Sequence, residues 1–301
     1  FDGSVGCFRQ THKTLRKDYM KKIIERIIVF VVGLPLIIGS VYFLPYQHFL
    51  VLHLEICIVT ALSIIEIRTM FSRKIAVYSM PIVIFAGMLI PVAVYLFMLG
   101  LFSRAVMTLI GIGALYFIFF VETFYSFSKP FEKSIQRVCS AAFIIFYPGL
   151  LVIFISAMTR WPSASNIIAM FLLMVFSCDS LAWLFGILFG KGNRGFVPAS
   201  PNKSIVGFIG GAVAATATGF LAFKLFPADF GKSLSGSLLT GFCTGLAAII
   251  GDLIESIFKR SAEVKDSGAL ILGRGGILDS IDSILLAAPV FYLCYRFFIG
   301  I

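Results

Sequence analysis

The sequence predicts an all-α, polytopic membrane protein with about nine transmembrane helices and a cytoplasmic N-terminus. Of its 301 residues, 59% are hydrophobic and only 13% are charged, and the mean hydropathy is +0.99. A soluble domain carries about 25% charged residues, so this chain has too little polar surface for a water-facing exterior. Apolar stretches long enough to cross a bilayer core, which needs about 20 residues per helix, recur along the whole sequence.

The apolar stretches end at short polar breaks, which set the expected helices in chain order. The nine expected spans cover residues 27–44, 49–67, 77–100, 105–121, 138–157, 167–189, 205–223, 234–251 and 283–300. They leave no room for a separate soluble domain. Residues 1–26 form a basic cytoplasmic segment, of which 1–19 precede Met20 and are interpreted as an extension. Two regions follow, the N-terminal transmembrane helices (27–157) and a C-terminal transmembrane region (158–301).

The distribution of Lys and Arg orients these spans. With the N-terminus inside, 20 of the 25 Lys and Arg residues fall on inside segments and only four fall on outside loops. Cytoplasmic loops are enriched in basic residues, so the net charge of +10 is mainly topological and nucleic acid is not expected as a partner. This arrangement predicts a multi-pass protein of the cell (plasma or inner) membrane.

The cysteines and most glycines of the chain have structural interpretations. Six scattered cysteines without a Cys-x-x-Cys pair argue against zinc, iron–sulfur or a disulfide framework. Three glycine pairs at helical spacing predict closely packed helices. They are Gly186 and Gly190, Gly207 and Gly211, and Gly241 and Gly245.

Acidic residues in apolar spans are costly and therefore mark candidate sites. Glu55 and Glu66 lie eleven residues apart in the second span. We expect Glu66 at the inner interface and a hydrogen bond from Glu55 to a neighbouring helix, although a site role stays open. Asp179 lies in the sixth span, and the segment 190–204 after it combines glycines with Lys191, Arg194 and Lys203. Such a segment can bind phosphate or can be an ordinary cytoplasmic loop.

The segment 251–283 is the most informative. If residues 251–260 are helical, Asp252, Glu255, Ser256 and Lys259 share one face. Asp279 and Asp282 form a second pair at i, i+3 after a glycine turn. Carboxylates at both membrane edges with basic residues between them suit divalent cations that hold polyphosphate, because Mg²⁺ takes one or two carboxylates plus phosphate oxygens. A solvated loop with surface ion pairs is the alternative.

These motifs resemble those of the phosphatidate cytidylyltransferases, or CDP-diacylglycerol synthases. The resemblance is carried by Ser256-Ile-Phe-Lys259-Arg260, Lys265-Asp266, Gly273-Arg274-Gly275-Gly276 and Asp279-Ser280-Ile281-Asp282-Ser283, which together form a signature at 256–283 in the C-terminal region. Upstream, the segments beginning at Asp179 and Ser200 are similar to further elements of the family. Three positions depart from its pattern: Val206 replaces a Glu, Arg274 a His and Ser280 an Arg.

The resemblance implies transfer of CMP from CTP to phosphatidic acid, which gives CDP-diacylglycerol and pyrophosphate at a site that faces the cytoplasm. It implies Mg²⁺ as cofactor in a two-cation site whose second ion is unidentified. The expected partners are CTP, phosphatidic acid and membrane lipids, with room for a homodimer. The implied catalytic residues are Asp252, Asp266, Asp282 and Lys259, the metal ligands Asp252, Asp279 and Asp282, and the substrate-binding residues Ser200, Asn202, Lys203, Ser256, Arg260, Lys265 and Arg274.

Three alternatives stay open at this point. The acceptor could be another lipid phosphate or a polyprenol, because nothing in the sequence identifies the lipid chain. The three departures would suit a relative of low activity, or one that binds nucleotide or lipid without turnover. A transporter would place charges near the bilayer midplane in both halves, whereas this acidic cluster lies at the inner edge of one half.

Overall fold

The computed structural model describes residues 33–151, 153–271 and 275–300. Within these ranges the chain is helical and forms no strands, as the sequence predicts. Among the described residues, eight helices are long and apolar enough to cross a membrane. The first expected span, 27–44, lies partly outside the described residues, and its described part contains the short helix α2 (Leu34–Phe43).

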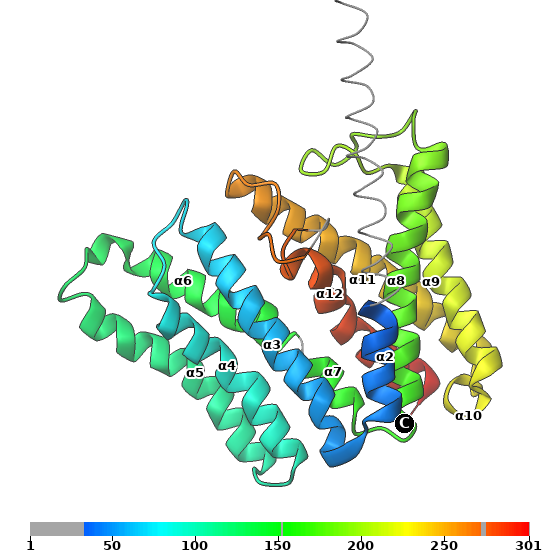
Figure 1. Cartoon of the computed structure of the whole chain (residues 1–301), viewed down its shortest axis with the longest axis horizontal. Helices are drawn as coiled ribbons and strands as arrows, with labels where there is room; N and C mark the ends of the chain where they lie inside the picture. The colour runs from blue at the N-terminus through cyan, green and yellow to red at the C-terminus, as the bar shows by residue number, and fades with distance from the viewer. Residues whose placement is uncertain (1–32, 152, 272–274, 301) are drawn as a thin grey trace, which may run out of the picture.

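The helices follow one another in the order expected from the sequence. They are α3 (Tyr46–Phe71), α4 (Met80–Met98), α5 (Arg104–Tyr125), η2 (Phe131–Lys133), α6 (Ser134–Ile144), η3 (Ile145–Leu150), α7 (Ile153–Met158), α8 (Ala164–Phe189), α9 (Ile205–Leu225), α10 (Pro227–Phe230), α11 (Leu234–Ser261), α12 (Leu278–Cys294) and η4 (Tyr295–Ile299). Figure 1 shows α4 and α5 on one side of the molecule and α8 and α9 on the other, with α11 and α12 between them.

Serine side chains define where several helices begin. The hydroxyls of Ser103, Ser204 and Ser233 accept hydrogen bonds from backbone N–H groups in the first turns of α5, α9 and α11. Each serine satisfies a donor that the start of a helix leaves without a partner. Ser204 matters most for the site, because it ends the loop 190–204 and places Lys203 next to α9.

Glycines and small residues bring α8, α9 and α11 into close contact. A side chain on Gly211 would lie 2.9 Å from the carbonyl oxygen of Cys178, and one on Gly241 would collide with that of Ala215. The expected packing role of the glycine pairs is therefore confirmed at these two positions. Glu55 also has its expected role, because its carboxylate accepts a hydrogen bond from Ser40 of α2 at 3.1 Å.

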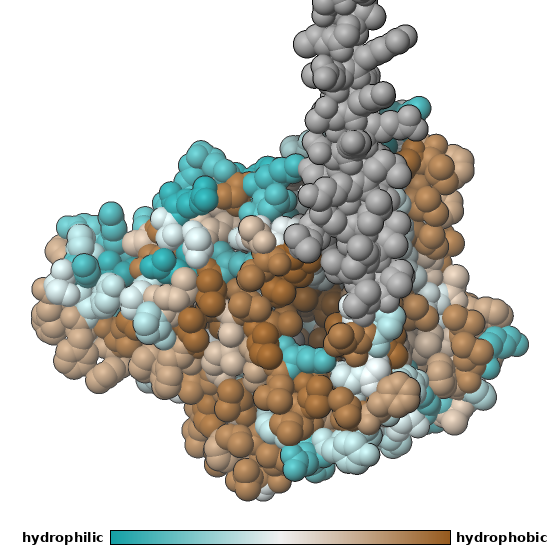
Figure 2. All heavy atoms as spheres, in the orientation of Figure 1, coloured by the Kyte–Doolittle hydropathy of each residue, from teal (hydrophilic) through white to brown (hydrophobic). Residues whose placement is uncertain are grey.

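Two helices differ from their expected bounds. Helix α11 continues to Ser261, ten residues beyond the predicted end, so residues 251–260 are helical. Helix α12 begins at Leu278, so Asp282 lies inside this helix and not just before it. The sequence placed both boundaries at the first charged residues, whereas here the helices include them: Asp252 is half-exposed and pairs with Lys203, and Asp282 is buried. Figure 2 shows a broad hydrophobic belt across the visible face, with hydrophilic residues gathered toward the upper and lower edges.

Candidate active site

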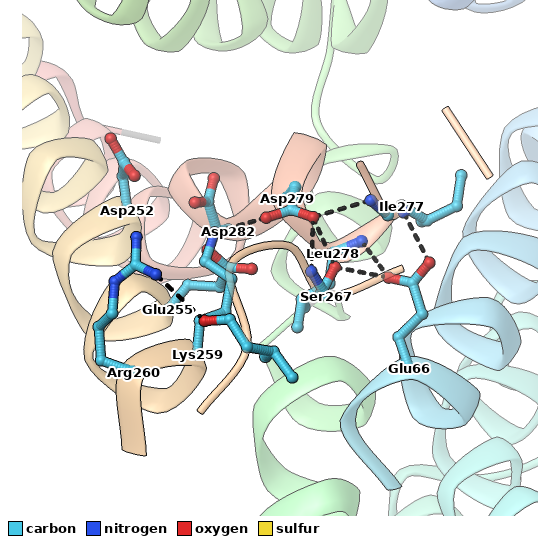
Figure 3. A network of polar contacts seen from close by, with 12 residues as sticks. Glu66, Asp252, Glu255, Lys259, Arg260, Ser267, Ile277, Leu278, Asp279 and Asp282 are labelled. Atoms are coloured by element: carbon cyan, nitrogen blue, oxygen red, sulfur yellow. Dashed lines mark hydrogen bonds and ion pairs between the residues drawn. The ribbon is translucent and has the colours of Figure 1, made fainter. Parts of the chain in front are cut away.

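The candidate site lies where the end of α11 meets the start of α12. The two helices touch at Gly251, because a Cβ atom there would lie 2.5 Å from the carbonyl oxygen of Asp282. The glycine therefore allows the backbones to approach closely and holds Asp252 near Asp282. Figure 3 shows these two aspartates with Glu255 and Lys259 at the junction of the two helices.

Lys259 joins the two helices through two carboxylates. Its ammonium group forms an ion pair with Glu255, one turn earlier on α11, and with Asp279 Oδ1 of α12 at 2.5 Å. Glu255 is fully buried and the Lys259 side chain is only 12% exposed, so water screens this triad weakly. The family resemblance implied a catalytic role for Lys259, but in this structure its ammonium group already pairs with two carboxylates.

The second oxygen of Asp279 fixes the turn before α12. Asp279 Oδ2 accepts hydrogen bonds from Ser267 N at 2.9 Å, Ser267 Oγ at 2.8 Å and Gly276 N at 2.7 Å. With Lys259 on the other oxygen, the carboxylate is well satisfied by protein donors. Gly275, in the same turn, has a φ of +110°, a conformation that favours glycine.

Glu66 reaches this turn from the other half of the chain. Its side chain, 5% exposed, accepts hydrogen bonds from Ile277 N and Leu278 N at 2.9 Å each and from Ser267 Oγ at 3.0 Å. Figure 3 shows Glu66 pointing from α3 at the N-terminus of α12. It therefore caps a helix distant in sequence, where a negative charge is also favourable to the helix dipole.

The sequence left a site role for Glu66 open. The available signal was its position as an acidic residue near the end of an apolar span. Its partners are backbone N–H groups more than 200 residues away, and no residue pattern shows such a contact.

Several carboxylates surround Asp282. The Asp282 side chain is buried, and Asp252, Glu255 and Asp179 all lie within electrostatic range of it. Its Oδ1 accepts a hydrogen bond from Ser283 N at 2.6 Å, and the Ser283 hydroxyl donates to Asp179 Oδ1 at 3.2 Å. Together with Asp279 this makes five carboxylates, and Lys203 and Lys259 form ion pairs with three of them.

The loop 190–204 lies against α11. Lys203 forms an ion pair with Asp252 Oδ2 at 2.6 Å, with side chains 22% and 38% exposed. The Arg260 guanidinium donates to the carbonyl oxygens of Ala199 and Val264, at 3.2 Å each. These contacts bring the loop 190–204 and the end of α11 to one surface. Both segments were connected with phosphate from the sequence.

The other predicted substrate-binding residues lie around this surface. Ser256 is buried in α11, Ser200 is half-buried, and Asn202, Lys265 and Asp266 are exposed. Arg274 lies outside the described residues. The structure thus brings Asp252, Asp282, Lys203 and Arg260 together. Lys259 and Asp279 instead pair with each other inside the protein.

A divalent cation fits part of the predicted ligand set. Within the described ranges, no three His, Cys, Asp or Glu side chains are close enough to hold a metal ion by themselves. Asp279 fits poorly because protein donors occupy both of its oxygens. Asp252 and Asp282 fit better, since Mg²⁺ needs only one or two carboxylates when phosphate oxygens complete its shell. Metal binding by all three aspartates stays a prediction.

A second contact connects the segment after α11 with the N-terminal half. Lys74, after α3, forms an exposed ion pair with Glu263, and this partner lowers the pKa of the Glu263 carboxyl below its usual value. Exposed pairs contribute little to stability. The buried contacts of Glu66 are therefore the main polar connection between α3 and the site.

We expect Gly251→Ala to destabilise the protein. The added methyl group would meet the Asp282 carbonyl oxygen and force α11 and α12 apart, at a cost of about 1–3 kcal/mol. Gly113→Ala in α5 is a matched control, because a Cβ atom there meets nothing within 4 Å and alanine favours a helix. Thermal unfolding in detergent should show a lower midpoint for the first variant only. Equal midpoints would show that the two helices can separate freely.

Comparison with known proteins explains this arrangement. A model of the cytidylyltransferase family matches residues 24–298. The chain belongs to the cytidylyltransferase family. The match includes α3, which carries Glu66, as well as the signature in α11 and α12. The family match therefore covers both segments that form the candidate site.

Individual relatives match the chain over shorter segments. A phosphatidate cytidylyltransferase of Chlamydia pneumoniae is 41% identical over 116 residues, which are 36% of this chain and 37% of the relative. Those of Haemophilus influenzae and Staphylococcus haemolyticus are 35% and 40% identical over 51% and 39% of this chain. The matched segments cover 54% and 44% of these two proteins, so the chain spans about half the length of the relatives it matches, or less.

Proposed function

We propose that this protein transfers CMP from CTP to phosphatidic acid and releases CDP-diacylglycerol and pyrophosphate. The observation that carries the proposal is the cluster of five carboxylates, three of them ion-paired with Lys203 and Lys259, beside a basic loop at one end of the transmembrane helices. Carboxylates gathered in this way suit a cation that holds a polyphosphate. The names of the relatives supply the choice of CTP and phosphatidate.

The reaction needs no protein nucleophile. An oxygen of the phosphatidate phosphate attacks the α-phosphorus of CTP, a new P–O bond forms, and the bond to the β-phosphate breaks so that pyrophosphate leaves. The protein has to align two anions and stabilise the charge of the transition state. Lys203 and Arg260 are placed to bind phosphate oxygens, and Ser200 and Asn202 to orient the nucleotide.

Asp252 and Asp282 would hold Mg²⁺, which supplies charge neutralisation for the phosphates when it is bound. Lys259 and Asp279 keep the signature turn and the two helices in place. We assign them this positioning role because Lys259 pairs with Asp279 and also with Glu255. Lys265, Asp266, Ser256 and Arg274 stay predicted site residues.

The proposed site faces the cytoplasm of a plasma or inner membrane. The support is the excess of Lys and Arg on the segments that include the site, because cytoplasmic loops are enriched in these residues. A cytoplasmic site is also where CTP is available to a membrane enzyme. Access of a membrane-impermeant thiol reagent to Asn202→Cys in intact cells tests this orientation.

The activity is tested with purified protein, labelled CTP, phosphatidic acid and Mg²⁺. We expect labelled CDP-diacylglycerol and pyrophosphate in equal amounts, and no product after addition of EDTA. Polyprenyl phosphate and lysophosphatidate replace the acceptor in parallel reactions. Absence of product with phosphatidate, or faster turnover of another acceptor, would overturn the assignment of the substrate.

A further inference from the structure

An apolar groove runs along the outer faces of α9 and α11. It encloses about 670 Å³ and has no charged residue in its lining. Its α9 side includes Ile209, Val213 and Ala217, and Val213 is 62% exposed. The groove is therefore open to the lipid, and it is separate from the carboxylate cluster.

The α11 side of the groove ends at the candidate site. Its lining residues on this helix are Leu238, Phe242, Leu246 and Ile249. Their spacing of four, four and three residues follows one helical face, and Asp252 is the next residue on that face. Asp252 is the residue that pairs with Lys203. An apolar stripe thus leads directly to a lysine ammonium.

The contacts between α9 and α11 confirm this alignment. Side chains on Gly219 and Gly241 would meet the carbonyl oxygens of Ser237 and Ala215, and one on Gly245 would lie 3.6 Å from the Cα atom of Ala212. These pairs define one antiparallel register, in which Asp252 faces the start of α9. Lys203 is therefore at the end of the groove that lies nearest to the site.

The length of the groove corresponds to one leaflet of a bilayer. Leu238 and Ile249 are eleven residues apart, which is about 16 Å along a helix. Half of a hydrocarbon core is about 15 Å. A chain that lies in the groove with its phosphate at Lys203 would thus reach the bilayer midplane, as an inner-leaflet lipid does.

We propose that this groove binds an acyl chain of the phosphate-bearing lipid substrate while Lys203 binds the lipid phosphate. The inference rests on the proposed function and adds the position of the lipid. A chain gains little free energy when it moves from lipid to an apolar groove, because both are equally apolar. The groove should therefore control alignment and chain length, and the phosphate should supply the affinity.

A second apolar groove, between α4 and α5, does not offer this arrangement. It encloses about 870 Å³, and its lining runs from Met80 to Leu96 on α4. Sixteen residues of helix span about 24 Å, which exceeds one leaflet. Its lining includes no neighbour of Asp252 or Lys203.

Ala217→Phe tests the proposal, because Ala217 lies at the end of the groove far from Lys203. The phenyl ring should shorten the groove and raise the ratio of the rates with dilauroyl and dipalmitoyl phosphatidate by about 10-fold. The KM for CTP should stay unchanged. Ala105→Phe, at an exposed position of α5 outside both grooves, is the matched control. A wild-type ratio in the Ala217→Phe protein would overturn the proposal.

A binding experiment separates this proposal from the proposed function. Wild-type protein is photolabelled with phosphatidate that carries a diazirine at the end of one acyl chain, and the labelled peptides are mapped. We expect labels on 205–225 and 234–250 that unlabelled phosphatidate displaces and diacylglycerol does not. Labels elsewhere, or a change from dimer to monomer in Ala217→Phe without a change in chain preference, would overturn the proposal that the groove binds the acyl chain. Labelling at the expected peptides without turnover would overturn only the proposed activity.

Discussion

Asp282→Asn is expected to lower CDP-diacylglycerol formation at least about 100-fold. Asp282 is 5% exposed and lies within range of Asp252, Glu255 and Asp179. A cation at this place would compensate the repulsion among these groups, and asparagine would remove one full charge from its ligands. The Mg²⁺ concentration for half-maximal rate should rise together with the loss of rate, which a titration of metal at saturating CTP measures.

Two variants control for damage to the fold. Asp229→Asn makes the same change at a distant residue, where the carboxylate accepts a hydrogen bond from Asn166, and it should keep nearly wild-type activity. Asp282→Glu keeps the charge and should recover part of the rate at high Mg²⁺. Wild-type turnover and metal dependence in Asp282→Asn would remove Asp282 from the proposed metal site.

The membrane fold could be predicted from composition and from the lengths of the apolar stretches. These signals are strong because a bilayer core forces every spanning helix to be long and apolar. The charged ends of helices were harder to predict. Asp252 and Asp282 were expected at helix boundaries because a lone charge in a helix is costly, yet both lie inside α11 and α12.

The partners of the site residues could be predicted less well than their positions. The spacing of Glu255 and Lys259 on one helix predicted that they share a face, and the structure confirms this with an ion pair. The spacing could not show that Asp279 also pairs with Lys259, since this contact depends on how α12 packs. The contribution of α3 was missed because Glu66 binds backbone groups, which no side-chain pattern in the sequence reveals.

Glu66→Gln is expected to lower the turnover rate at least about 10-fold with a smaller change in thermal stability. The carboxylate accepts from Ile277 N and Leu278 N, and it shares the single hydroxyl proton of Ser267 with Asp279 Oδ2. An amide offers one acceptor oxygen, and its NH₂ group would face one of the backbone N–H groups. A buried donor left without an acceptor costs about 1–3 kcal/mol, which the first turn of α12 can relieve only by moving.

Movement of that turn should appear in the metal dependence, because α12 carries Asp282 one turn further on. We therefore expect Glu66→Gln to raise the Mg²⁺ requirement, and Glu66→Asp, which keeps the charge, to recover part of it. Glu55→Gln in the same helix is the matched control, since an amide oxygen can still accept the hydrogen bond from Ser40. A Glu66→Gln protein with lower thermal stability but wild-type turnover and metal dependence would show that Glu66 only stabilises the fold. The proposed positioning of Asp282 through α3 would then be wrong, although the assignment of Asp282 itself would stand.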